Sequence, residues 1–142
     1  MHTTWIVIAD EGGARFLSCD APGGELAEVD EFSDPAAHAD NADLRRDAYG
    51  RRGSSVTSSA GEDKLDHEAE AFARRVAERL TRAQREQRYA ELRIAAAPRF
   101  LGRLRKALDA EVAKRVVAEF DKDWLQLDRR ELARKVFPPA GA

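Results

Sequence analysis

The arginines are the residues of this sequence whose pattern most clearly indicates a binding function, and four of them lie in one short segment. That segment reads RRDAYGRRGSS and holds four arginines, one tyrosine and two glycines. Guanidinium groups pair with phosphate oxygens, and a tyrosine ring can stack on an unpaired base. We therefore predict an RNA-contacting segment made of Arg45, Arg46, Tyr49, Arg51, Arg52, Gly53, Ser54 and Ser55. The alternative is a solvated loop without a partner.

A second concentration of basic residues runs from Arg74 to Lys106, with eleven basic and three acidic side chains. Within it, Arg75 and Arg79 stand four residues apart, so a helix would place both on one face. An arginine face of this kind predicts contact with the phosphates of a nucleic acid. A merely solvated helix face is the alternative.

The stretch Ala97-Pro98-Arg99-Phe100 predicts the start of another helix, because proline fits the first helical position. The exposed N–H groups of such an end attract anions, and Arg99 and Arg103 would stand beside it. We therefore predict a phosphate or carboxylate site at this turn. In the alternative interpretation, Phe100 packs into the core and both arginines are solvated.

Apolar alternation, turn glycines and three- to four-residue repeats predict the elements that position these arginines. The predicted strands are Thr4–Asp10, Ala14–Cys19, Glu25–Phe32, Glu91–Ala97 and Val116–Phe120. The predicted helices begin at Leu65, at Arg99 and at Arg129, with a short helical piece after Asp109. Two short glycine turns join the first three strands into an antiparallel meander, and right-handed crossovers add the other two. The sequence thus predicts one α/β domain with a mixed five-stranded sheet in the order 3-2-1-4-5, element order β-β-β-α-β-α-β-α, helices on its faces and a ribonuclease H-like topology.

Residues 33–64 separate the third predicted strand from the first long helix, and they contain few large apolar side chains. A stretch of this composition predicts a long flexible loop at about 33–64. At its end, Asp63 or Asp66 would cap the helix, where a carboxylate accepts orphan backbone N–H groups.

Catalytic chemistry finds little support in the sequence. Nucleases with this topology place metal-binding carboxylates on the first strand, the first helix and the fourth strand. Asp10 ends the first predicted strand, but the fourth ends in Ala95-Ala96-Ala97, so we interpret Asp10 as a turn residue. Cys19 is alone, and no zinc spacing joins the three histidines, His2, His38 and His67. We expect no catalytic residue, no metal and no cofactor.

Composition narrows the protein class. The chain has 142 residues, room for one domain, and a net charge of -2, which excludes a strongly basic nucleic-acid module and an acidic disordered tail. Its apolar runs are too short to span a bilayer, and no basic residue precedes Arg15 as a secretory signal would require. We expect a cytoplasmic protein.

Four segments together resemble the bacterial host attachment protein family, whose members are described as required for attachment to host cells. The segments are TWIVIADEGGARFL, DHEAEAFARRVAERL, RIAAAPRFLGRLRKAL and VAEFDKD. That family is in turn similar to the central domain of archaeo-eukaryotic translation release factors. The resemblance implies a ribonuclease H-like fold and a loop, before the first long helix, that in release factors carries Gly-Gly-Gln and promotes peptidyl-tRNA hydrolysis.

Here Arg51, Arg52 and Gly53 resemble the basic lead-in to that motif, but Ser54-Ser55 stand where its second glycine and its glutamine would be. The departure argues against hydrolysis and leaves binding to tRNA or ribosomal RNA as the implied function. We therefore predict a non-enzymatic RNA- or ribosome-binding module that affects attachment indirectly. A protein-interaction or adhesion-related factor is the alternative, and a peptidyl-tRNA hydrolase has the least support.

Overall fold

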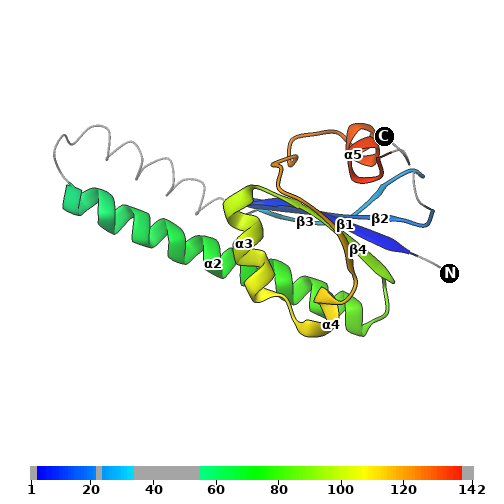
Figure 1. Cartoon of the computed structure of the whole chain (residues 1–142), viewed down its shortest axis with the longest axis horizontal. Coiled ribbons are helices and arrows are strands. Elements are labelled where there is room, and N and C mark those ends of the chain that lie inside the picture. Colours follow the sequence, from blue (N-terminus) through cyan, green and yellow to red (C-terminus); the bar gives the residue numbers. More distant parts are fainter. Residues whose placement is uncertain (1–2, 22–23, 34–54, 139–142) are drawn as a thin grey trace.

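A computed structural model describes residues 3–21, 24–33 and 55–138 of the chain, with the backbone alone for residues 55–65. Its elements form a central sheet with helices on both faces (Figure 1). The predicted loop residues from Arg45 to Ser54 lie outside the described residues.

The sheet has five strands in the order β3-β2-β1-β4-β5, which confirms the predicted order. The strands are β1 (Thr4–Asp10), β2 (Gly13–Cys19), β3 (Ala27–Ser33), β4 (Glu91–Ala96) and β5 (Val116–Phe120). β1 pairs antiparallel with β2 and parallel with β4; β2 pairs antiparallel with β3, and β4 parallel with β5. The third strand begins at Ala27, two residues later than predicted.

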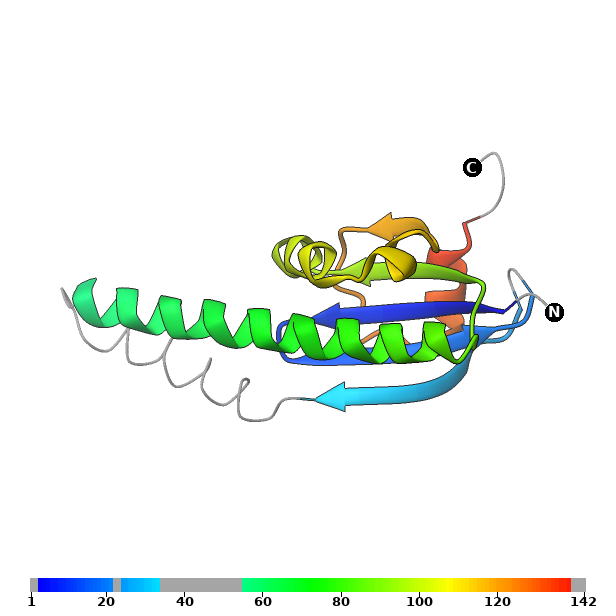
Figure 2. The ribbon, with the colours of Figure 1, turned by 90° about the horizontal axis from the view of Figure 1, so that it is seen from below.

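The helices are α2 (Ser55–Arg85), α3 (Pro98–Ala107), α4 (Ala110–Ala113) and α5 (Arg129–Val136). α2, α3 and α4 lie on one face of the sheet, and α5 lies on the other (Figures 1 and 2). Both faces are therefore covered, which explains why β1 is an almost continuous apolar run rather than an alternating one.

The side chains on the two faces of β1 belong to two separate hydrophobic cores. Trp5 and Val7 point to the side where Phe72 and Val76 of α2 pack. Ile6 and Ile8 point to the side of α5. Trp5 is 2 % exposed, and the other side chains named here are 0 or 1 % exposed. Burying side chains of this size stabilises the fold by about 1.5–3 kcal/mol each.

The start of α2 corrects the sequence prediction. The helix begins at Ser55, ten residues before Leu65, so residues 55–64 are helical rather than part of a flexible loop. Asp63 and Asp66 lie inside the helix and cannot be its N-terminal cap. The sequence SVTSSAGEDK has low helix propensity and no apolar stripe, which is why its pattern predicts a loop. The turns of α2 that pack on the sheet nucleate the helix, and each further residue then adds one hydrogen bond. The helix can therefore continue beyond the part that packs on the sheet, as Figure 2 shows.

Candidate nucleic-acid interface

A groove lies between α2 and β3, the outer strand of the sheet on that side. It has a volume of about 340 Å³, and its lining consists of Phe32, Arg75, Glu78, Arg79 and Arg82. The three arginines come from one face of α2 because their spacing of four and three residues matches the helical repeat. We call this feature the α2–β3 groove.

Arg79 forms the floor of the α2–β3 groove. Its Nε lies 2.9 Å from the Oδ2 atom of Asp30 on β3, and the Arg79 side chain is only 10 % exposed. The Arg79 guanidinium also lies 5.2 Å from the centre of the Trp5 ring. The hydrogen bond from Arg79 holds the pKa of Asp30 below its ordinary value. Arg79 is therefore neutralised and tied to the fold.

Arg75 is held differently, by aromatic rings. Its guanidinium carbon lies 5.4 Å from the centre of the Phe32 ring and 5.5 Å from that of Phe72. A guanidinium over the face of a ring keeps its positive charge, and the N–H groups at its edge can still donate hydrogen bonds to another partner. Arg75 and Arg82 are both exposed, so these are the groove arginines that solvent can reach.

Arg99 and Arg103 lie on α3 and do not join this groove. Arg103 donates to the Oδ1 atom of Asp66 at 2.8 Å and to Oε1 of Glu70 at 3.5 Å, and its side chain is 16 % exposed. These contacts tie α3 to α2. Arg99 is exposed in the first turn of α3, beside an N-cap at Ala97 that makes no side-chain hydrogen bond. The turn predicted as an anion site thus has one of its two arginines committed to carboxylates.

The structure describes four of the predicted site arginines, two in the groove and two on α3. Ser55 is the first residue of α2, and the other predicted loop residues lie outside the described part of the chain. Sequence reasoning left Arg82 out of the site, although it follows Arg75 and Arg79 at helical steps. Nothing in the sequence indicates that Phe32 belongs to the site, because its position beside α2 depends on how β3 packs in the fold.

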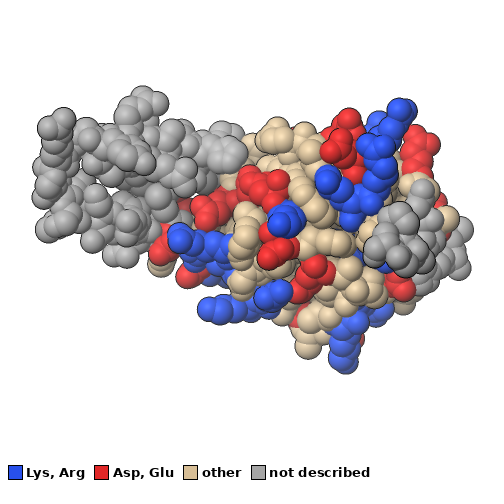
Figure 3. Space-filling model, turned by 45° about the horizontal axis from the view of Figure 1, so that its top comes forward, with Lys and Arg blue, Asp and Glu red and all other residues tan. Residues whose placement is uncertain are grey.

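On the face shown in Figure 3, lysines and arginines are interspersed with aspartates and glutamates, and the described residues form no single basic patch there. A polyanion that approached this face would therefore find no broad basic surface.

The carboxylate of Asp10, which the sequence offered for metal chemistry, lies in a turn. The Oδ1 atom of Asp10 accepts the N–H of Gly12 at 2.9 Å, which confirms Asp10 as a turn residue. Burial and the nearby Asp10 raise the pKa of Asp123, which follows β5. Within residues 3–21, 24–33 and 66–138, the side chains bring together no group of three or more His, Cys, Asp or Glu that could hold a metal ion.

Comparison with known proteins extends these observations. None of the described helices is long and apolar enough to cross a membrane. No curated protein matches the sequence. Among solved structures, the crystal structure of the archaeal translation termination factor aRF1 is similar, with a TM-score of 0.58 and 13% sequence identity. The match covers 97% of this chain and 35% of the factor, so this chain spans about a third of that protein's length and shares its fold there.

The family comparison covers nearly the whole chain. Residues 5–136 match the family model described as "Protein required for attachment to host cells". The matched span runs from the second residue of β1 to the end of α5 and includes all the other described strands and helices in full. This chain therefore belongs to the family of proteins required for attachment to host cells.

Proposed function

We propose that this protein is a non-enzymatic RNA-binding module that contacts tRNA or ribosomal RNA and affects attachment to host cells indirectly. The observation that carries the proposal is the α2–β3 groove, where Arg75 and Arg82 reach solvent between two anchored side chains, Phe32 and Arg79. The Arg75 guanidinium, held over the Phe32 and Phe72 rings, loses less entropy when it binds phosphate than a free surface arginine does.

The likeness of the fold to a translation termination factor supports the choice of RNA as the partner. The arginine-rich segment with Arg45, Arg46, Arg51 and Arg52 supplies a second set of cations, just before α2 in the sequence. In this proposal the groove positions the phosphate backbone, and Tyr49 stacks on an unpaired base.

Co-sedimentation with ribosomes, at low and at high salt, tests the proposal. Three variants accompany the wild type: Arg75→Gln/Arg82→Gln in the groove, a loop variant with Arg45, Arg46, Arg51 and Arg52 changed to Ala, and a control. The control is Arg130→Gln/Arg134→Gln. Like the groove variant it removes two positive charges, but it removes them from α5, on the other face of the sheet.

The wild type and the control are expected to sediment with ribosomes at low salt, and the groove and loop variants are expected to remain in the supernatant. Each lost contact with single-stranded phosphate should also reduce the slope of log affinity against log salt by about 0.7. Equal behaviour of the groove variant and the α5 control would contradict the groove, and a wild type that never sediments would contradict RNA binding altogether.

A protein partner is the second candidate, and the edge of β5 favours it. β5 is the last strand of the sheet, and Val117 on it is 50% exposed, the one large apolar side chain so exposed among the described residues. An outer strand offers unpaired backbone groups to which a strand of another protein can add. If Val117→Lys abolishes capture of a protein from cell lysate while ribosome sedimentation is absent, this candidate replaces the first.

A further inference from the structure

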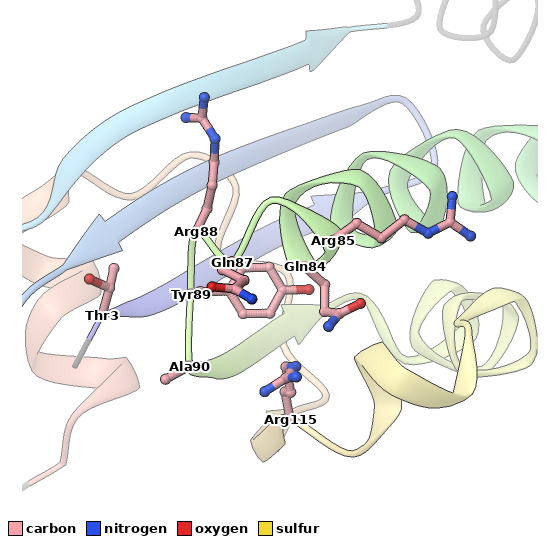
Figure 4. A pocket seen from close by; sticks show the side chains of 8 residues that line it. All are labelled: Thr3, Gln84, Arg85, Gln87, Arg88, Tyr89, Ala90 and Arg115. Atoms are coloured by element: carbon pink, nitrogen blue, oxygen red, sulfur yellow. The ribbon is translucent and has the colours of Figure 1, made fainter. Parts of the chain in front are cut away.

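A second polar pocket lies at the other end of α2, where that helix turns into β4 (Figure 4). It has a volume of about 330 Å³, which is within the usual range for small-molecule sites. Its lining consists of Thr3, Gln84, Arg85, Gln87, Arg88, Tyr89, Ala90 and Arg115. Among these described lining residues three are arginines, two are glutamines and none is acidic. We propose that this pocket binds a phosphate group.

The centre of the pocket is built by Arg115, Gln84 and Tyr89. Figure 4 shows the Arg115 and Gln84 side chains next to each other beside the Tyr89 ring, whereas the Arg85 and Arg88 side chains point away from these three. The Nε atom of Arg115 is enclosed by protein and has no hydrogen-bond partner among the described residues. An Nε–H donor without a partner gains from an acceptor beside it, and a phosphate oxygen is an acceptor that also suits the positive charge of the guanidinium.

The wall of the pocket is rigid. Tyr89 is 4% exposed, donates its hydroxyl hydrogen to the carbonyl oxygen of Leu80 at 2.8 Å, and lies 5.3 Å from the Trp5 ring between ring centres. A fixed wall limits the entropy that a ligand must remove when it binds.

A helix C-terminus would repel an anion if its last carbonyl groups were free, but here they are occupied. The carbonyl oxygens of Arg82, Ala83 and Gln84 accept backbone N–H groups at 3.1, 2.9 and 2.9 Å. Arg88 forms an ion pair with Glu86 at 3.0 Å, and Arg85 points away from the centre of the pocket, so Arg115 supplies the positive charge there. The charge of Arg115 opposes the repulsion that the helix dipole exerts on an anion.

Gln87 lies in the lining of the pocket and has an unusual backbone conformation. Its φ angle is 58°, in the left-handed region, and it is the one non-glycine residue with positive φ in the described part of the chain. The residue just after a helix commonly adopts this conformation and is usually glycine, which does so without strain. A glutamine there retains the strain and places an amide donor in the lining of the pocket, a combination typical of functional sites.

The test is an NMR titration of the full chain with inorganic phosphate at constant ionic strength. Saturable shifts are expected at the backbone amides of Gln87, Tyr89 and Arg115. Arg115→Gln should weaken the affinity by about tenfold or more, because it removes a charged donor. The control Lys114→Gln removes a charge from the neighbouring residue, which is exposed and pairs with Glu111 outside the pocket, and should leave the affinity within about twofold of the wild type.

A further variant separates binding from folding. Gln87→Gly should raise the midpoint of thermal unfolding, because it relieves the left-handed strain, and yet weaken phosphate binding, because it removes the amide. Absence of saturable shifts, an equal loss in Lys114→Gln, or unchanged affinity in Gln87→Gly would each overturn the proposal.

Two further arms identify the source of the phosphate. One uses adenosine monophosphate, and the other compares an oligoribonucleotide with a 5′-phosphate to the same oligonucleotide with a 5′-hydroxyl. Tighter binding of the phosphorylated end assigns the pocket to RNA termini, and binding of the mononucleotide alone assigns it to a free metabolite. The groove variant Arg75→Gln/Arg82→Gln should retain phosphate binding, so failure of the RNA-binding proposal and failure of this one are distinguishable.

Discussion

The Nε atom of Arg79 lies 2.9 Å from the Oδ2 atom of Asp30, and this ion pair joins the long helix α2 to the outer strand β3. The same guanidinium covers the Trp5 ring of the central strand at 5.2 Å. The α2–β3 groove therefore has its width set by an ion pair at its floor, and its solvent-facing arginines stand on either side of that fixed point.

Asp30→Asn should lower the free energy of unfolding at neutral pH by up to about 1 kcal/mol, because the Asp30 carboxylate is partly exposed and screened. The pKa of Asp30 is held below 3.8, chiefly by the Arg79 hydrogen bond, so its contribution is fully present above 3.8 and is lost as the pH falls through the lowered pKa. Urea unfolding at neutral pH and well below 3.8 checks this. Glu131→Gln, in an exposed pair with Arg134, serves as the control. A loss that is the same at both pH values would contradict the ion-pair explanation.

Asp123→Asn should have the opposite sign and stabilise the protein at neutral pH by about 0.5 kcal/mol. Burial and the charge of Asp10 raise the pKa of Asp123, so deprotonation in the folded state costs free energy once the pH exceeds 3.8. The asparagine removes that cost and can still accept the Leu125 N–H. The gain should disappear in acid below 3.8, where the wild-type carboxyl is protonated in both states. Denaturation curves at the two pH values decide it, and a destabilised variant at neutral pH would show that the charge is needed.

Tyr89 should ionise far above an ordinary tyrosine. Burial raises its pKa from the ordinary 10.0 to about 12, against a smaller opposing effect of Arg115. Because folding raises this pKa, the protonated Tyr89 hydroxyl contributes its full stabilisation of the folded state below pH 10.0. That contribution is lost as the pH rises through about 12. Ultraviolet titration of the wild type, with Tyr89→Phe as the reference, gives the Tyr89 pKa by difference. A difference curve centred near 10 would show that the ring is accessible to water.

Arg15→Met should lower the free energy of unfolding by about 2 kcal/mol, because it leaves two inward-facing carbonyl groups without their charged donor. Nη1 of Arg15 donates to the carbonyl oxygens of Leu125 at 3.0 Å and Leu127 at 2.6 Å, and so holds the segment before α5 against β2. Glu28→Gln is the matched control, since it loses only the exposed partner of Nη2 at 2.7 Å. Chemical denaturation compares the two, and an equal effect of both changes would mean that the carbonyl contacts contribute nothing.

The order of the strands could be predicted because local signals determine it. Gly12-Gly13 sits between two apolar runs and predicts a hairpin, which the pairing of Asp10 with Gly13 confirms. The crossover after β3, through α2, and the crossover after β4, through α3 and α4, follow from the right-handed rule. Pro98 marks the start of α3 for the local reason that its ring fits the first helical turn.

The site could be predicted only where it depends on one helix. The spacing of Arg75 and Arg79 places them on one face, but their partners Phe32 and Asp30 come from a strand far away in the sequence. Arg103 and Arg75 both belong to the basic stretch from Arg74 to Lys106, so the sequence does not distinguish them. In the structure, however, Arg103 forms ion pairs with carboxylates of α2. A pattern of charges cannot tell a bonded arginine from an available one, because the difference lies in tertiary contacts.

The two edges of the sheet have unequal chemistry, and this limits what a sheet-to-sheet association could build. β3 carries the carboxylates of Glu28, Asp30 and Glu31, of which Arg15 pairs with the first and Arg79 with the second. Charged side chains along an outer strand oppose the addition of another strand. β5 exposes Val117 and carries a single carboxylate, Glu119, which lies 2.6 Å from Arg105. If two copies paired through β5 about a two-fold axis, that edge would be closed to a third copy, so such an association would end at a dimer.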